Sequence, residues 1–210
     1  MTKRSYSQNC ALAIALDVIG DRWTLLIVRE VMIRPRRFKE LQANLQGIGT
    51  NLLSERLQQL VGDQILLREG TGHPVYTIGV NGEGLKTSVY SLIRWGMNFN
   101  DRRNQTQHED PDWLILVLRA YFNAQAGRAW QGVYQLVIDE QEYFLACVEN
   151  ELHIQQEPAD IIASIRVSSS TAQRLAAGEV DIAVVIDSGD LKVKGREADI
   201  NQFFLAFDNT

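Results

Sequence analysis

The segment MIRPRRFKEL, residues 32 to 41, contains four cations in six consecutive positions: Arg34, Arg36, Arg37 and Lys39. The cluster stands out because the whole chain has a formal net charge of -5. Guanidinium and ammonium groups gathered in a loop suit contact with the phosphates of a polyanion. We therefore predict Arg36, Arg37 and Lys39 as phosphate contacts. The alternatives are an ordinary solvated surface, or internal pairing of Arg37 with Glu40 or Asp21.

The next segment predicts a helix over residues 50–62 with two unlike faces. Leucines at 53, 57 and 60 recur at helical spacing, and the opposite face carries amides and hydroxyls with little net charge. Such groups suit the edges of DNA bases, although a polar face is also typical of a solvated helix. Arg56 lies between the two faces, where it either binds phosphate or braces the fold. The predicted DNA-reading set is Thr50 (as helix cap), Asn51, Ser54, Glu55, Arg56 and Gln58.

Groupings typical of catalysis or metal binding do not occur. The histidines, His73, His108 and His153, share no metal-ligand spacing with Asp, Glu or Cys, and the sequence has no Gly-x-Ser-x-Gly motif. Cys10 and Cys147 are far apart and form no CxxC pair. We predict a reduced, cytoplasmic protein that is not an enzyme and needs no metal or cofactor. No apolar run reaches the roughly 18 residues that would cross a membrane.

The elements around these residues follow a recognisable order. Apolar spacing predicts helices over residues 10–19 and 22–33 and a short third helix before the helix of residues 50–62. On the second helix, Arg22, Arg29 and Glu30 are expected to face outward. Two β-rich runs joined by Gly70 to Pro74 then predict a hairpin, and a long helix follows to about residue 100. This order predicts a winged helix-turn-helix with His73, at the hairpin tip, near the DNA backbone or minor groove.

The charge distribution divides the chain. Residues 1–103 hold 14 Lys and Arg against 9 Asp and Glu, whereas residues 104–210 hold 7 against 17. A basic half joined to an acidic half indicates a polyanion-binding module linked to a second domain. The polar run DRRNQTQHEDPD, in which Pro111 interrupts the chain, marks the join. We predict a DNA-binding and dimerisation domain at 1–103, a linker at 104–112 and a second domain at 113–210.

The second half predicts an α+β domain with an antiparallel-rich sheet and flanking helices. A helix is expected over residues 112–126, and alternating apolar residues then predict a meander of strands. The run from Ile182 to Ile186 is rich in β-branched residues and predicts extended structure rather than a helix. A final helix is expected from Glu197 to Phe207.

The first half resembles the HxlR-type (MarR-like) winged-helix transcriptional regulators. The resemblance implies a homodimer joined through the first and last helices of this half, with the helix of residues 50–62 in the major groove of DNA. Gly79 departs from the pattern, because these proteins usually begin the last helix with Thr. The matching residues are Cys10, Ile19-Gly20-Asp21-Arg22-Trp23-Thr24-Leu25-Leu26-Ile27, Arg37-Phe38-Lys39-Glu40-Leu41, Ile48, Leu53-Ser54-Glu55-Arg56-Leu57, Tyr76, Gly82 and Leu85.

Cys10 is a candidate redox switch, because some members of that family use a cysteine at this position. A thiol near a helix N-terminus has a lowered pKa and oxidises as the thiolate. Lys3 and Arg4 would add to this effect. The alternative is a cysteine packed at a dimer interface, where it would be inert.

The string SIRVSSSTAQRLAAGEVDIAVVIDSGDLKVKGREADINQFFLAF is similar to the C-terminal part of sterol carrier protein 2-like domains. Those domains enclose an apolar tunnel, so the resemblance implies a pocket for an apolar small molecule. The alternative for each aromatic residue here is an ordinary place in a core. The candidate lining residues are Trp113, Phe122, Trp130, Tyr134, Tyr143, Phe203 and Phe204.

These patterns together predict a sequence-specific DNA-binding transcriptional regulator. Its expected partners are double-stranded DNA, a second copy of the chain and an apolar small molecule, with no membrane. Modulation is expected through the second domain or through Cys10. A carrier of apolar ligands that uses the winged helix only for dimerisation is the alternative, favoured by the near-neutral reading face and the acidic second half.

Overall fold

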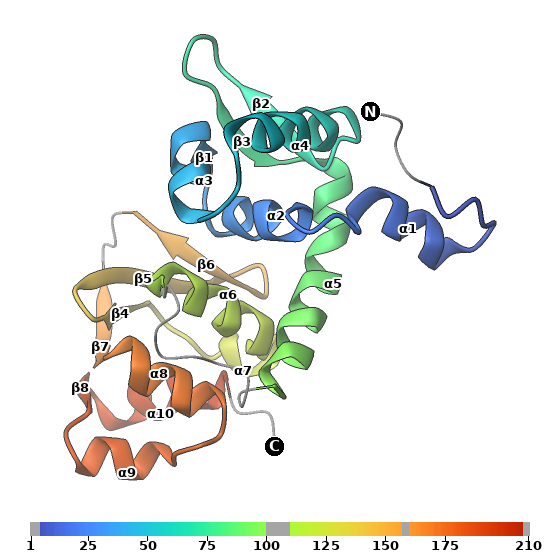
Figure 1. Cartoon of the computed structure of the whole chain (residues 1–210). Helices are drawn as coiled ribbons and strands as arrows, with labels where there is room; N and C mark the ends of the chain where they lie inside the picture. The colour runs from blue at the N-terminus through green and yellow to red at the C-terminus, as the bar shows by residue number, and fades with distance from the viewer. Residues whose placement is uncertain (1–4, 100–109, 157–159, 208–210) are drawn as a thin grey trace. The chain divides into compact units, whose positions relative to one another are not determined.

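The computed structural model describes residues 5–99, 110–156 and 160–207 (Figure 1). The chain divides into two compact units, Met1–Val89 and Tyr90–Thr210. Helix α5 (Val80–Met97) runs through the division. Residues 104–109 of the predicted linker lie outside the described residues.

The first unit contains the predicted winged helix-turn-helix. A three-stranded antiparallel sheet with the order β1-β3-β2 closes it, and Leu66 of β2 lies opposite Ile78 of β3. The short strand β1 pairs Arg36 with Tyr76 and was not predicted. The elements before α5 are α1 (Ala11–Ile19), α2 (Thr24–Ile33), β1 (Arg36–Arg37), α3 (Phe38–Asn44), α4 (Thr50–Gly62), β2 (Leu66–Glu69) and β3 (Val75–Ile78).

The core of the first unit is built from the apolar faces of α2, α3 and α4. Ile27 and Val28 of α2, Leu41 of α3 and Leu53 of α4 are completely buried. Leu57 is 1% exposed and Leu60 is 2% exposed, so the predicted leucine face of α4 is confirmed. Burial of these side chains fixes the rotation of α4 about its own axis, and its polar face must therefore point outward.

One expectation for the first helices was wrong. Glu30 was expected to face outward, but its side chain is completely buried because two arginines and an asparagine bond to it. On helix α1, Leu12, Ile14 and Leu16 are 67%, 53% and 39% exposed. Helix α1 thus presents exposed apolar side chains, on the helix that the resemblance assigns to a dimer interface.

The second unit is a mixed sheet with helices packed on it. The strand order is β6-β5-β4-β7-β8, in which β4 and β7 run parallel and the other neighbours run antiparallel. Helix α10 contacts β7 and β8, and α9 contacts β8. The elements are α6 (Pro111–Tyr121), α7 (Ala124–Gly127), β4 (Val133–Ile138), β5 (Gln141–Val148), β6 (Glu151–Gln155), β7 (Ile161–Val167), α8 (Ser169–Ala176), α9 (Ile182–Asp187), β8 (Leu191–Gly195) and α10 (Glu197–Leu205).

The prediction of extended structure from Ile182 to Ile186 is wrong, because these residues form helix α9. The Asp181 carboxylate accepts a hydrogen bond from the backbone N–H of Ala183 at 2.8 Å and caps the helix. Val185 packs into the core while Val184 remains 58% exposed, as a one-sided helix requires. Capping and burial therefore outweigh the β propensity of the run.

The start of the second unit also differs from expectation. Pro111 was expected to lie in the linker, but it is the first residue of helix α6. Proline is common at this position, because the first residue of a helix needs no backbone N–H. Asp110 caps this helix by accepting a hydrogen bond from the backbone N–H of Asp112 at 2.9 Å. A single helix was predicted over residues 112–126, but two helices are observed. Asn123 caps the second one, α7.

Candidate DNA-binding surface

The polar face of α4 is the largest part of the candidate surface. Asn51 and Gln58 are exposed, and Ser54 and Glu55 are half-buried on the same side. Thr50 is exposed but does not cap the helix as expected, because Gly49 occupies the cap position and α4 begins at Thr50. Sequence reasoning thus placed these side chains on the correct face and misplaced the cap by one residue.

Arg36 is the clearest correction to the predicted phosphate contacts. Its side chain is 3% exposed, and its Nη2 lies 3.5 Å from Oε2 of Glu30. Its Nε also donates to the main-chain oxygen of Glu30 at 3.4 Å. A guanidinium that is buried against a carboxylate cannot approach a phosphate without breaking that pair. Arg36 therefore has a structural role in the first unit.

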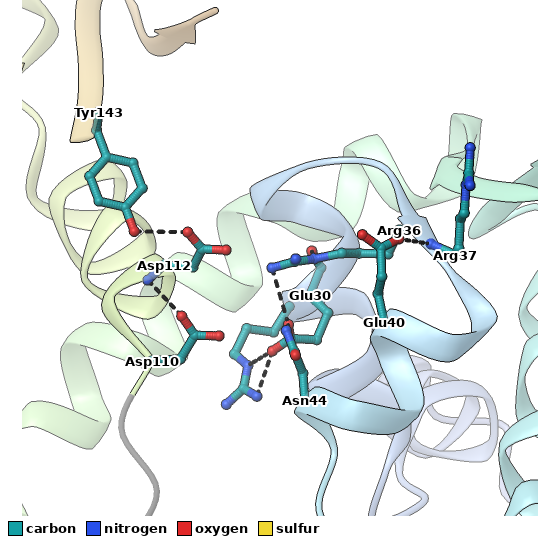
Figure 2. A network of polar contacts seen from close by, with 9 residues as sticks. Glu30, Arg36, Arg37, Glu40, Asn44, Asp110, Asp112 and Tyr143 are labelled. Carbon is teal, nitrogen blue, oxygen red and sulfur yellow. Dashed lines mark hydrogen bonds and ion pairs between the residues drawn. The ribbon is translucent and has the colours of Figure 1, made fainter. Parts of the chain in front are cut away.

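Glu30 is the centre of the polar cluster that buries Arg36 (Figure 2). Its Oε1 accepts hydrogen bonds from Nε and Nη2 of Arg29 at 3.0 and 2.7 Å. Its Oε2 accepts one from Nδ2 of Asn44, the last residue of α3, at 2.8 Å. The cluster therefore ties α2 to β1 and to the end of α3. Sequence reasoning missed it, although the position of Glu30 among the apolar residues of α2 was a signal.

Arg37 and Lys39 remain available for phosphate contact. Both side chains are exposed, and in the described part of the chain neither takes part in an ion pair. Figure 2 shows the Arg37 side chain directed away from Glu30 and Glu40. The Glu40 carboxylate accepts a hydrogen bond from the backbone N–H of Arg37 at 2.6 Å and leaves the guanidinium free of that acid.

Arg56 braces the first unit. Its Nη1 lies 2.7 Å from Oδ2 of Asp21 and also donates to Oε1 of Gln59 at 2.5 Å. The side chain is only 17% exposed. Of the two roles left open for Arg56, the structure favours the bracing one, because the pair holds α4 to the turn between α1 and α2. Asp21 is therefore the partner of Arg56 and not of Arg37.

The hairpin of β2 and β3 forms the wing. Its connection contains Gly70 and Gly72 at φ values of +85° and +84°, a conformation that side chains with a Cβ rarely adopt. His73 follows them and is exposed at the tip, as predicted. Leu67 of β2 and Thr77 of β3 lie opposite each other in the middle of the hairpin.

Cys10 is the residue before the first turn of α1 and is exposed. Hydrogen bonds from the backbone N–H groups of Ala13 and Leu12 stabilise the thiolate and lower the pKa of Cys10 below its usual value. This lowering was predicted from the helix position. Lys3 and Arg4 lie outside the described residues.

The candidate pocket residues of the second unit pack mainly on one another. Trp130 lies with its ring centroid 4.4 Å from that of Tyr134 and 5.7 Å from that of Phe203. Phe122 and Phe204 are half-buried at the edge of this cluster. Burial raises the pKa of Tyr134 to about 12. The alternative that these aromatics fill a core is thus the arrangement observed.

Two of the candidate pocket residues lie on neighbouring parts of the second unit. The Tyr143 hydroxyl donates to Oδ1 of Asp112 at 2.8 Å, which links β5 to the first turn of α6 (Figure 2). Tyr143 is buried with the core cluster. Trp113, the next residue on α6, is half-buried and is not a member of that cluster.

Among the described residues, no group of three or more His, Cys, Asp or Glu side chains is placed to hold a metal ion. Within the described segments, no helix combines the length and the apolar character that crossing a membrane requires.

A helix-turn-helix with an exposed polar second helix, followed by a β-hairpin wing, defines the first unit as a winged-helix DNA-binding module. The family model described as HxlR-like helix-turn-helix matches residues 18–104. The uncharacterised HTH-type transcriptional regulator Rv3095 of Mycobacterium tuberculosis is 34% identical over 111 residues, which cover 46% of this chain and 70% of that protein. The chain therefore belongs to the HxlR-like helix-turn-helix family of DNA-binding transcriptional regulators.

Further relatives match the same half. The HTH-type transcriptional regulator YodB of Bacillus subtilis is 30% identical over 89 residues, which cover 40% of this chain and 80% of that protein. A solved structure of quinone-bound YodB from B. subtilis has 29% identity and a TM-score of 0.39, and the match covers 42% of this chain and 98% of that one.

Proposed function

We propose that the protein binds DNA as a homodimer, with α4 in the major groove and with Arg37 and Lys39 on the flanking phosphates. The observation that carries the proposal is the pairing of a buried leucine face on α4 with an outward face that includes exposed Asn51 and Gln58. Amides of this kind pair with adenine through two hydrogen bonds. Phosphate contacts then set affinity, and the α4 side chains set preference.

The remaining contacts in the proposal come from Thr50, Ser54, Glu55 and His73. The first three share the outward side of α4 with the two amides. His73 extends the surface through the wing tip toward the neighbouring backbone or minor groove. Arg36 and Arg56 are not included, because each is held by an acid within the unit.

The homodimer is proposed to form through α1 and α5. Leu12 and Leu16 on α1 and Leu92 and Trp95 on α5 are exposed apolar side chains, with Trp95 at 63%. Exposed apolar surface of this extent favours association. Two copies related by a twofold axis would present their α4 helices to half-sites about 34 Å apart.

Two routes of modulation are proposed. The exposed Cys10, with its lowered pKa, is suited to oxidation that alters DNA affinity. The second unit is proposed to be a sterol carrier protein 2-like domain that takes up an apolar small molecule. The string that resembles those domains folds into β7, α8, α9, β8 and α10, in which α9 and α10 pack on the strands, and this arrangement supports the assignment.

The proposed domains are residues 1–103 and 113–210, joined by a linker at 104–112 whose last two residues, Pro111 and Asp112, begin α6. Because its partner is DNA and both described cysteines are free thiols, the proposed place of action is the reducing cytoplasm.

A fluorescence anisotropy titration with labelled duplexes selected from a random library tests the proposal. Arg37→Ala/Lys39→Ala should weaken binding to all duplexes alike, whereas Asn51→Ala/Gln58→Ala should remove only the preference for the selected one. Lys192→Ala/Lys194→Ala is the matched control, because it removes two exposed cations from the second unit. Equal weakening by the control and by the first pair would refute the proposed phosphate contacts.

A further inference from the structure

One side-chain hydrogen bond joins the two helices of the helix-turn-helix where α4 begins. Nε2 of Gln42 in α3 lies 2.7 Å from Oγ1 of Thr50, the first residue of α4. Thr50 is exposed and Gln42 is half-buried. Thr50 is one of the proposed DNA contacts, whereas Gln42 was not among the predicted site residues.

The direction of this bond determines where the Thr50 proton points. A threonine hydroxyl has one proton to donate and two lone pairs that accept. An amide nitrogen only donates, so the Thr50 oxygen is the acceptor of this bond. The hydroxyl proton of Thr50 is therefore left for another acceptor.

The first unit offers little competition for that proton. Inside a helix, a threonine often donates to a main-chain oxygen of the preceding turn, but Thr50 begins α4 and has no such turn. In the part of the chain that the structure describes, Gln42 is the one hydrogen-bond partner of the Thr50 hydroxyl. Because Thr50 is exposed, its proton is available to an acceptor outside the unit, on the side that the proposed function assigns to DNA.

We propose that Gln42 is a positioning residue that presents the Thr50 hydroxyl as a donor to a phosphate oxygen of the DNA. Phosphate oxygens only accept hydrogen bonds, so a hydroxyl whose oxygen is already held by an amide has the polarity that a phosphate requires. This inference rests on the proposed function and adds to it a residue that touches no DNA itself.

The variant Gln42→Glu separates positioning from a simple tie between α3 and α4. A glutamate has nearly the same shape, but its carboxylate only accepts, so Thr50 must donate to it. The tie between the helices is then kept with its polarity reversed, and the proton is no longer available to a phosphate. If Gln42 only holds the helices together, reversing the polarity has no effect beyond that of the added charge.

A double-mutant cycle on the full-length protein measures this difference. The four proteins are wild type, Gln42→Glu, Thr50→Val and the double variant, titrated by anisotropy with one selected duplex. Valine removes the hydroxyl at constant shape, so the effect of Gln42→Glu in the Thr50→Val background reports charge repulsion alone. We expect Gln42→Glu to weaken binding about tenfold more when Thr50 is present than in the Thr50→Val background, the size of one hydrogen bond to a charged acceptor.

Equal losses in the two backgrounds would overturn the positioning role while leaving the proposed function in place. If wild type binds no duplex at low salt, the proposed function fails and the positioning role fails with it. Thermal unfolding of the free proteins checks that Gln42→Glu is folded. If it is not, Gln42→Met in the same cycle removes the donor without adding charge, and equal losses with and without the Thr50 hydroxyl would again overturn the positioning role.

Discussion

At the scale of single residues, the structure separates cations that the sequence presents as equivalent. Arg36 and Arg37 are neighbours, yet Arg36 is buried against Glu30 and Arg37 is exposed. The difference arises because consecutive residues of an extended strand point to opposite sides. The sequence indicated a cluster of charge but not which cation has an internal partner, since that partner lies on another element.

Removing the acid at the centre of the cluster should destabilise the first unit strongly. We expect Glu30→Ala to lower the free energy of unfolding by about 3 kcal/mol, because it leaves Arg36 buried without its acid. Urea denaturation followed by circular dichroism measures the loss. Glu40→Ala is the control, and as Glu40 is exposed it should cost no more than about 1 kcal/mol. Equal losses for the two variants would contradict the structural role of Glu30.

The thiol of Cys10 should react at lower pH than an ordinary thiol. Its pKa is lowered in the folded protein by backbone N–H groups, so the reactive thiolate forms earlier as the pH rises. The rate of iodoacetamide alkylation is measured against pH on the Cys147→Ser variant. The pH at which the rate is half-maximal should be lower for the folded protein than for the same protein unfolded in urea. Coincident folded and unfolded profiles would show that the helix start does not activate Cys10.

At the scale of elements, the helix-turn-helix and the wing were predictable because their signals are local. Leucine spacing on α4 and the glycines of the hairpin depend only on neighbouring residues. Helix α9 was missed because a β-branched run carried more weight in the sequence than the Asp181 cap, and burial of Val185 depends on the rest of the second unit. The aromatic residues were predicted to line a pocket, whereas their packing on one another in a core depends on the tertiary structure.

Truncation should lower the free energy of unfolding much more on the buried face of α4 than on its exposed face. Leu57→Ala removes a side chain that is 1% exposed and should lower the free energy of unfolding by about 3 kcal/mol. Gln58→Ala, the adjacent exposed residue, should change it by no more than about 0.5 kcal/mol. Urea denaturation measures both. A loss at Gln58 as large as that at Leu57 would mean that α4 is rotated from the orientation described.

At the scale of the whole molecule, the central feature is the difference between a first half with a formal charge of +5 and a second half with -10. Because the two charges have opposite signs, the net charge of the whole chain is small and does not reveal the basic first half. They also favour DNA association by the first half, because phosphate attracts one half and repels the other. The exposed apolar residues of α1 and α5 are those through which the proposed homodimer would form.

Charge placed on the exposed apolar residues of α1 and α5 should separate the proposed homodimer. We expect Leu16→Glu/Trp95→Glu to be monomeric when molar mass is measured by light scattering during size-exclusion chromatography, because burying an unpaired carboxylate opposes association. Val184→Glu/Leu205→Glu changes two residues of the second unit that are 58% and 57% exposed and should remain dimeric. A dimer that survives the first change would place the interface elsewhere.

The salt dependence of DNA binding tests the central claim most directly. The dissociation constant of the full-length protein for one selected duplex would be measured between about 50 and 200 mM salt, for wild type and for Arg37→Ala/Lys39→Ala. Each lost phosphate contact should reduce the slope of log affinity against log salt by about 0.9, so two such contacts in each chain of a dimer should make the variant clearly flatter. Equal slopes for the two proteins would contradict the assignment of Arg37 and Lys39 to the DNA backbone.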